Sequence, residues 1–293
     1  MKVINYIKTN IEIIIFFILV AILAYLILCK SWEGFFTLQN GINRLDAIIY
    51  INLENRGDRK DLFIKELEKL NTDMSKVHKV SGVYMPKNGH KGCVQSHILA
   101  LNMIKMNDWN RVLILEDDAE LDMYPELINT IINKSLEELD KQQSDWNVLM
   151  LATANKVLDD SHNTNTTIKT IPIEINSIDI PKEGSPSPSS SSPSQPASSV
   201  SLKIQKLKTA TTASAYIVNK SYVDTILNLF NHCNTNMSPE KLNGNDFEIW
   251  ALDQKWFDIQ MKDKWYCFDT DIIKQRAIWS TTQSNVGKYA THT

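Results

Sequence analysis

Residues 111–118 read RVLILEDD, and this stretch decides what kind of sheet the chain can build. The apolar run VLIL predicts a strand buried on both faces, because a strand with one solvated face would alternate apolar and polar residues. Three carboxylates follow at once, Glu116, Asp117 and Asp118. Adjacent negative charges resist burial unless a cation offsets them. The cluster is therefore either a solvated turn, with Asp118 or Asp122 capping a helix, or a cation site.

Strand-like and helix-like stretches alternate on both sides of this strand. Apolar and β-branched runs predict strands, and apolar residues at i, i+4 and i+7 predict helices. The expected strands are residues 47–53, 77–80, 111–115, 146–151 and 213–219, and the expected helices are residues 58–71, 91–107, from about 125, 221–230 and 246–258. This order predicts an α/β fold with an open, mostly parallel sheet covered by helices on both faces.

One segment breaks the alternation after residue 155. Residues 184–199, GSPSPSSSSPSQPASS, lack the apolar side chains that a packed core requires. The segment is either a domain boundary or an insertion within one domain. We favour a disordered insertion of about residues 156–203, because the strand and helix expected after it are too small to form a second domain. The main domain then covers residues 46–285.

The amino-terminal residues form a separate region. Residues 11–29, IEIIIFFILVAILAYLILC, are almost wholly apolar, and 19 helical residues at about 1.5 Å each approach the ~30 Å core of a bilayer. A buried core helix or a cleaved signal peptide are the alternatives; we predict an uncleaved transmembrane anchor. Residues 1–10 become a cytoplasmic tail, since Lys2 and Lys8 precede the span, and residues 30–45 a stem.

That orientation places the main domain across the membrane, in the ER or Golgi lumen of a eukaryotic host. Sequons of the form Asn-x-Ser/Thr are compatible with a lumenal glycoprotein and occur at Asn133, Asn165, Asn219 and Asn236. The formal net charge of −3 gives no reason to expect a nucleic-acid partner. The cysteines are Cys29, Cys93, Cys233 and Cys267, and their spacing indicates neither a zinc site nor a disulfide framework.

Three further stretches carry candidate site residues. Arg56 and Arg59 follow the 47–53 strand and are suited to forked hydrogen bonds with phosphate. In GHKGCVQSHILA, Ser96 and His97 are adjacent, so on a helix they point about 100° apart and do not make a nucleophile–base pair. Asp253 lies among tryptophans, where burial raises a carboxyl pKa towards that of a useful base. Solvated or structural roles are the alternative for each.

Taken together, these stretches resemble glycosyltransferase family 25, which includes lipopolysaccharide-type galactosyl- and glucosyltransferases and procollagen galactosyltransferases. The resemblance rests on INLENRGDR, GHKGCVQSHILA, LILEDD, AYIVNK and DQKW, in this order along the chain. It covers about residues 46–285, apart from the Ser/Pro-rich segment. The resemblance covers one glycosyltransferase unit, whereas the animal collagen enzymes have two in tandem.

The resemblance implies a GT-A-like fold that binds UDP-galactose or UDP-glucose with Mn²⁺ or Mg²⁺ and transfers the hexose with inversion. It implies Asp118 and Glu116 as metal ligands, with Glu116 or Asp117 near the donor ribose. It also implies a carboxylate base, for which Asp253 is the first candidate, with Glu248 and then Asp246 behind it. Donor contacts are expected from Arg56, Arg59, Ser96 and His97.

The acceptor is left open by the sequence: a glycan, a collagen-like protein or a lipid-linked glycan all offer hydroxyl groups. Two other function classes compete with the transferase. A glycan-binding relative without catalysis would keep the fold and bind sugar without metal. A metal-dependent sugar or phosphodiester hydrolase would use the same carboxylates but turn over donor without an acceptor.

Overall fold

The computed structural model describes residues 18–25, 41–159, 170–175, 200–237 and 249–276. The chain divides into two units, Met1–Asn40 and Gly41–Thr293. In the first unit, residues 18–25 are helical, and the rest of the expected anchor at 11–29 lies outside the described residues. None of the helices in the described ranges is both long enough and apolar enough to cross a bilayer.

The second unit alternates strands and helices over most of its length. Its strands are β1 (Ala47–Asn52), β2 (Val77–Ser81), β3 (Arg111–Glu116), β4 (Ala119–Leu121), β5 (Val148–Met150), β6 (Ala154–Leu158), β7 (Thr170–Ile175), β8 (Val200–Thr211), β9 (Ala215–Asn219), β10 (Trp265–Phe268) and β11 (Ile273–Gln275). Its helices are η1 (Gly41–Arg44), α2 (Gly57–Lys69), η2 (Met74–Lys76), α3 (Gly89–Asn107), α4 (Pro125–Gln142), α5 (Lys220–Asn236), α6 (Leu252–Lys255) and α7 (Phe257–Gln260).

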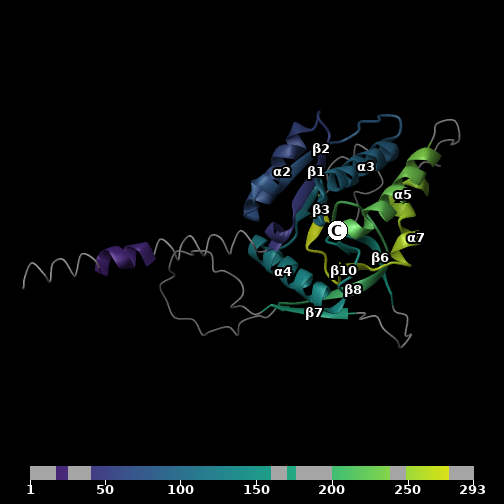
Figure 1. The fold of residues 1–293 in the computed structure, drawn as a ribbon. Helices are drawn as coiled ribbons and strands as arrows, with labels where there is room; N and C mark the ends of the chain where they lie inside the picture. Colours follow the sequence, from purple (N-terminus) through teal and green to yellow (C-terminus); the bar gives the residue numbers. More distant parts are fainter. Residues whose placement is uncertain (1–17, 26–40, 160–169, 176–199, 238–248, 277–293) are drawn as a thin grey trace, which may run out of the picture. The chain divides into compact units, whose positions relative to one another are not determined.

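Among the described residues, one large sheet has the order β2-β1-β3-β9-β5-β10-β8-β6, with β7 paired to β8 (Figure 1). Strand β1 is parallel to β2 and β3, and β5 is parallel to β10. Strand β9 runs antiparallel to both β3 and β5, so it joins two sets of strands that share one direction. The expected α/β class, with a mostly parallel sheet flanked by helices, is confirmed.

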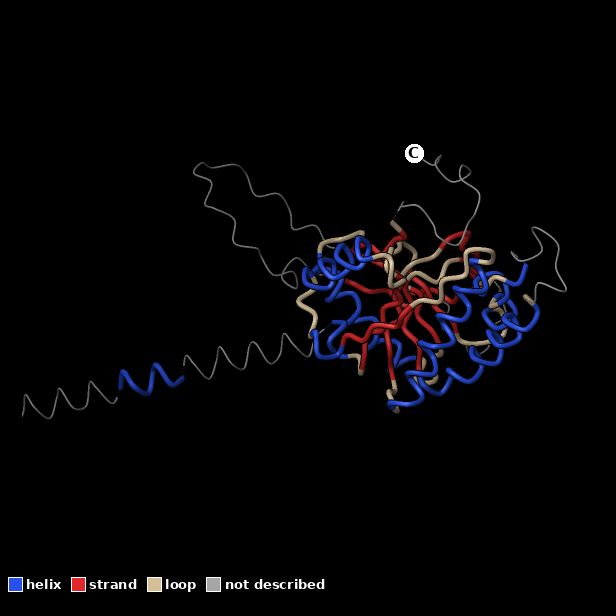
Figure 2. Tube along the Cα trace, turned by 90° about the horizontal axis from the view of Figure 1, so that it is seen from above, coloured by secondary structure: helices blue, strands red, loops and turns tan. Residues whose placement is uncertain are grey.

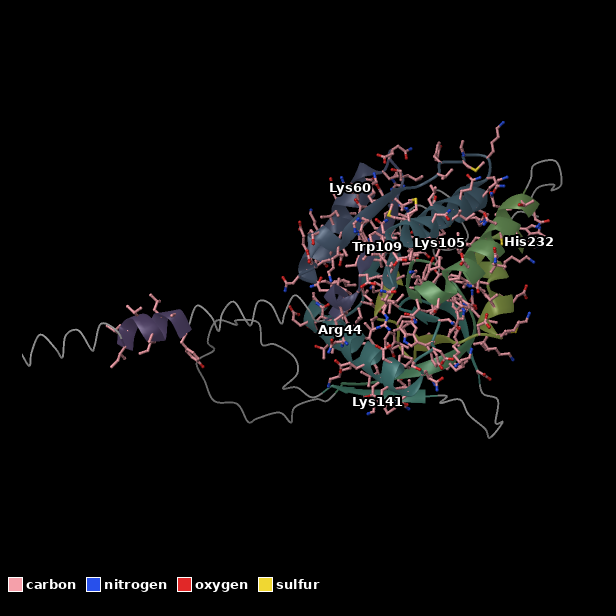
Figure 3. All side chains as sticks on the ribbon, viewed as in Figure 1. Arg44, Lys60, Lys105, Trp109, Lys141 and His232 are labelled. Carbon is pink, nitrogen blue, oxygen red and sulfur yellow. The ribbon has the colours of Figure 1, made fainter. Side chains whose placement is uncertain are left out.

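Helices cover both faces of this sheet, which separates the core into two layers. Tyr50 of β1 packs with Phe63 of α2 on one face, whereas Ile49 packs with α3 and α5 on the other. Every residue of β1 is buried, as expected for a strand with both faces covered. From above, the strands lie between blue helices on either side (Figure 2). Figure 3 shows the labelled lysines Lys60 and Lys105 on these outer helices.

Two expected boundaries differ from the structure. The folded unit begins at Gly41 rather than at 46, because Ile42 of η1 and Leu45 are fully buried in the core. The segment from about 156 to 203, expected to be disordered, contains the end of β6, all of β7 and the start of β8. Strand β7 adds Ile171 and Ile173 to the core. The Ser/Pro-rich stretch 184–199 lies outside the described residues.

The expected helix at 246–258 is also different. Its described part breaks into the short helices α6 and α7, and β10 and β11 follow them. The indole of Trp256 lies at the break, fully buried, and its Nε1 donates to the carbonyl oxygen of Ala210 at 2.8 Å. The aromatic residues of this segment therefore anchor it against β8 instead of forming one face of a continuous helix.

Candidate active site

The acidic cluster lies where the parallel strands β1 and β3 end. Glu116 is the last residue of β3, and its backbone N–H donates to the carbonyl oxygen of Ser214 at 2.9 Å. Ser214 belongs to the turn between β8 and β9, so this bond ties the cluster to a segment about 100 residues away in sequence. In open α/β sheets ligands bind at the carboxyl ends of the strands. The acidic cluster therefore lies at the carboxyl ends of the strands, where the sequence predicted it.

Both carboxylate oxygens of Asp117 accept hydrogen bonds from protein side chains. Its Oδ1 accepts from Arg59 Nη1 at 2.8 Å, and its Oδ2 accepts from Asn52 Nδ2 at 2.8 Å. All three side chains are nearly inaccessible to solvent. Burial raises the pKa of Asp117, and the hydrogen bond from Asn52 and the charge of Arg59 oppose that rise. Asp117 thus joins the end of β1 and the start of α2 to the end of β3.

Glu116 has a different set of partners. Its Oε1 lies 3.1 Å from His97 Nε2 and 3.5 Å from Cys93 Sγ, both on α3. Burial alone would raise the pKa of Glu116, but the hydrogen bond and charge of His97 outweigh burial and lower it. On its other side, His97 Nδ1 lies 3.0 Å from the hydroxyl of the fully buried Tyr216. The lowered pKa favours the ionised form of Glu116.

Asp118 is buried without a full set of partners. Its Oδ2 accepts from Gln275 Nε2 at 3.1 Å, whereas no group among the described residues donates to its buried Oδ1. Burial and then the negative charge of Glu116 raise the pKa of Asp118 to about 7. A buried oxygen that lacks a donor is uncommon in a folded protein. This atom is therefore a candidate ligand for a cation.

The cluster forms one side of a pocket, with about 640 Å³ of space that is partly open to solvent. The segment 82–85 also lines the pocket, and α3 holds it in place. The hydroxyl of Ser96 donates to Gly92 O at 2.7 Å and accepts from Val83 N at 2.8 Å. A Cβ on Gly92 would lie 2.4 Å from Val83 O, so only glycine permits this approach. The lining includes Leu53, Arg59, Tyr84, Cys93, Asp118 and Gln275.

Asp253 lies at the start of α6 and reaches the same region. Its Oδ2 accepts from the backbone N–H of Thr212 at 3.1 Å, two residues before the Ser214 that binds Glu116. Burial raises the pKa of Asp253, and the charge of Glu116 raises it further. Thr212 has φ of +74°, an unusual conformation for a β-branched residue. Asp253 is therefore held by the same β8–β9 turn that binds Glu116, although it is outside the pocket lining, and its role as the base stays a prediction.

The other residues expected at the site differ in whether they line the pocket. Arg59 and Ser96 line the pocket, but His97 is fully buried behind Glu116 and does not. Arg56 is outside the pocket lining, and its guanidinium makes a forked ion pair with Asp58 at 2.9 and 2.8 Å. Donor contacts from His97 and Arg56 stay predictions, since neither residue lines the pocket. Glu248 and Asp246 lie outside the described residues.

Several residues at this site were not expected from the sequence. Asn52 and Gln275 each hold one aspartate, and Tyr216 holds His97. Asn52 closes an apolar strand, which is a position where a polar residue often meets a ligand or a partner. Gln275 comes from a segment without hydrophobic periodicity. Its contact with Asp118 depends on the pairing of β11 with β4, so nothing in the neighbouring sequence predicts it.

Three comparisons relate the chain to known proteins. The family model described as glycosyltransferase family 25 (LPS biosynthesis protein) matches residues 76–239, more than half of the chain. A glycosyltransferase involved in glycosylation of the major capsid of PBCV-1 has 8% identity and a TM-score of 0.42, with 80% of this chain and 94% of that chain covered. No curated protein matches the sequence.

Two further solved structures are similar at a comparable level. A197 from STIV has 10% identity and a TM-score of 0.36, with 78% of this chain and 83% of that chain covered. Mannose-1-phosphate geranyltransferase from Thermus thermophilus has 9% identity and a TM-score of 0.36, with 80% of this chain and 75% of that chain covered.

Proposed function

We propose, from the premise that this chain belongs to glycosyltransferase family 25, that it transfers a hexose from UDP-galactose or UDP-glucose to a hydroxyl acceptor with inversion. The observation that carries the proposal is the asymmetry of the acidic cluster. Arg59 and Asn52 satisfy Asp117, while Asp118, beside the pocket, presents a buried oxygen to which no described residue donates. A carboxylate left in this state is suited to bind a cation that arrives with the donor.

The donor set at this edge fits a hard divalent ion. Mn²⁺ and Mg²⁺ take oxygen ligands and are commonly held by one or two carboxylates together with substrate phosphates. Asp118 and Glu116 would hold the ion. When bound, such an ion offsets the charge that builds on a departing diphosphate. Its positive charge would also favour the ionised form of Asp118, whose pKa is raised in its absence.

The remaining residues have roles that their contacts support. Arg59 brings positive charge to the pocket while it holds Asp117, and the 82–85 segment with Tyr84 offers a wall for the nucleoside. Asp253 is proposed as the base. It takes the proton of the acceptor hydroxyl while that oxygen bonds to the anomeric carbon and the bond to the diphosphate breaks. A raised pKa suits this step, since a base works best with a pKa near the working pH. Glu248 remains the second candidate.

Membrane attachment is part of the same proposal. The apolar residues 11–29 would anchor the chain, with residues 1–10 in the cytoplasm and the transferase domain on the lumenal side. Its support is the hydropathy of the sequence. Alkaline washing of membranes from expressing cells tests this proposal: an anchored chain stays in the pellet, and release into the wash excludes the anchor.

The test of function is release of UDP by the full-length chain from a panel of UDP-sugars, with and without Mn²⁺ and with a panel of hydroxyl acceptors. We expect metal-dependent release from one hexose donor, accelerated by an acceptor and lost in Asp118→Asn. The matched control is Asp122→Asn, an exposed acid paired with Lys274, which should keep activity. Release that no acceptor accelerates would favour a hydrolase, and no release from folded protein would exclude the transferase.

A further inference from the structure

Three side chains of different chemistry converge at the floor of the pocket, which Cys93 and Glu116 line and behind which His97 is fully buried. Cys93 and His97 are one turn apart on α3, so they share a face, and Glu116 meets them from the end of β3. Sγ of Cys93, a ring nitrogen of His97 and a carboxylate oxygen of Glu116 all lie within 4.8 Å of one another. Both α3 atoms point at the same oxygen, Oε1, from 3.5 and 3.1 Å.

The two distances from Glu116 Oε1 match those between ligands of one tetrahedral zinc ion. Zinc binds nitrogen and oxygen at about 2.0–2.1 Å and sulfur at about 2.3 Å, so tetrahedral angles separate nitrogen from oxygen by about 3.4 Å and sulfur from oxygen by about 3.6 Å. The observed distances of 3.1 and 3.5 Å differ from these values by only a few tenths of an ångström. Small side-chain rotations would accommodate the ion.

The combination of sulfur, nitrogen and oxygen ligands indicates which metal ion the site would bind. Mn²⁺ and Mg²⁺ prefer oxygen, whereas sulfur and imidazole nitrogen are ligands of zinc. The cysteine spacing gave no such indication, because the fold supplies only one ligand as cysteine and takes the others from His97 and Glu116. This set is therefore different in chemistry from the proposed manganese ligands, although Glu116 belongs to both.

The surroundings of His97 prepare it for this role. Its Nδ1 lies 3.0 Å from the hydroxyl oxygen of Tyr216, which is fully buried and can accept the Nδ1 proton. On zinc binding, that tautomer would present the lone pair of Nε2 to the ion, in place of the N–H that donates to Glu116 when no ion is bound. A hydrogen-bonded second nitrogen is the usual arrangement for a zinc-bound histidine.

We propose that Cys93, His97 and Glu116 bind one Zn²⁺ at the floor of the pocket, with the fourth coordination position open to it. Cys93 and Glu116 both line the pocket, so a water or a ligand group can reach that position. On binding, the Cys93 thiol proton is released to the solvent, and the thiolate and Glu116 together balance the charge of the ion. The site is defined by its donors and does not rest on the proposed function.

The test uses cobalt as a probe, because tetrahedral Co²⁺ bound to a thiolate has a charge-transfer absorption that oxygen-ligated Co²⁺ lacks. Co²⁺ is titrated into the metal-free full-length chain, and Zn²⁺ is then added to displace it. We expect the absorption to saturate at one Co²⁺ per chain and to disappear with Zn²⁺. If the folded wild-type chain develops no such absorption, the site does not exist, and Cys93 and His97 serve only as hydrogen-bond donors to Glu116.

Variants assign the signal to these residues. Cys93→Ser should abolish the absorption and weaken Zn²⁺ binding at least about 10-fold, measured by competition with a chromophoric chelator. Cys233→Ser is the control, since Cys233 is a buried free cysteine of α5 outside this donor group, and it should keep the absorption. Asp118→Asn should also keep it, which separates this site from the proposed manganese site. Absorption unchanged in Cys93→Ser would overturn the proposal.

Discussion

Asp117 and Asp118 are neighbours in the chain, yet their side chains are held by two different regions. We call them the β1 side, formed by β1, α2, α3 and β3, and the β11 side, formed by β8, β10, β11 and the turn at Thr212. On the β1 side, Arg59 and Asn52 occupy both oxygens of Asp117. On the β11 side, Gln275 reaches one oxygen of Asp118, and the other has no donor among the described residues. The contacts on the β1 side therefore stabilise the buried charge of Asp117 and have a structural role. The β11 side leaves one carboxylate oxygen that no described residue satisfies.

The largest effect on stability should come from removing the Arg59–Asp117 ion pair of the β1 side. Arg59→Met removes the partner of Asp117 and leaves a buried charge unpaired, which typically costs about 3–5 kcal/mol. We expect the free energy of unfolding to fall by this order, measured by urea denaturation. Arg56→Gln, which removes only an exposed ion pair, is the control and should leave the midpoint unchanged. Equal effects of both variants would mean that the β1 side is not structural.

On the β11 side, removing the charge should stabilise the metal-free protein. The pKa of Asp118 is raised from 3.8 to about 7, so the folded state binds the proton more tightly than the unfolded state. Stability is then lost as pH rises from about 4 to 7. Asp118→Asn removes this loss, and at pH 8 it should gain on the order of 4 kcal/mol over wild type. The gain should vanish at pH 4, and a variant less stable at pH 8 would contradict the assignment.

The third effect concerns catalysis. Asp253→Asn keeps the shape of the side chain but removes the proposed base, so turnover should fall at least about 100-fold while UDP binding stays unchanged. Asp258→Asn, in the adjacent helix α7, is the matched control. If Asp253→Asn retained most of the turnover, the base would have to be sought at Glu248.

The smallest effect should come from Thr212, since the β11 side is also the strained one. Its φ of +74° costs a β-branched residue about 1 kcal/mol, and asparagine tolerates this conformation. Thr212→Asn keeps the backbone N–H that holds Asp253 and should raise stability by about 0.5–1 kcal/mol in thermal unfolding. A loss of stability would show that the contacts of the Thr212 hydroxyl outweigh the strain.

The two sides also differ in how far the sequence predicts them. The elements of the β1 side, β1, α2, α3 and β3, have strong periodicity and short connections, so their bounds were predicted within a few residues. The strands β8, β10 and β11 were missed. Strand β8 adjoins a low-complexity segment, and β10 and β11 are short and pair only with distant strands. The partners of Asp118 and Asp253 come from this second region, which is why the local pattern identified the carboxylates but not their settings.

The most direct test of the account is the binding of Mn²⁺ to the metal-free full-length chain in the presence of UDP. Binding is followed by loss of the electron paramagnetic resonance signal of the free ion, so catalysis is not required. We predict saturable binding by wild type and by Asp122→Asn, and affinity at least about 10-fold weaker in Asp118→Asn. Equal Mn²⁺ binding by all three proteins would contradict the claim that the unsatisfied carboxylate of the β11 side is a metal ligand.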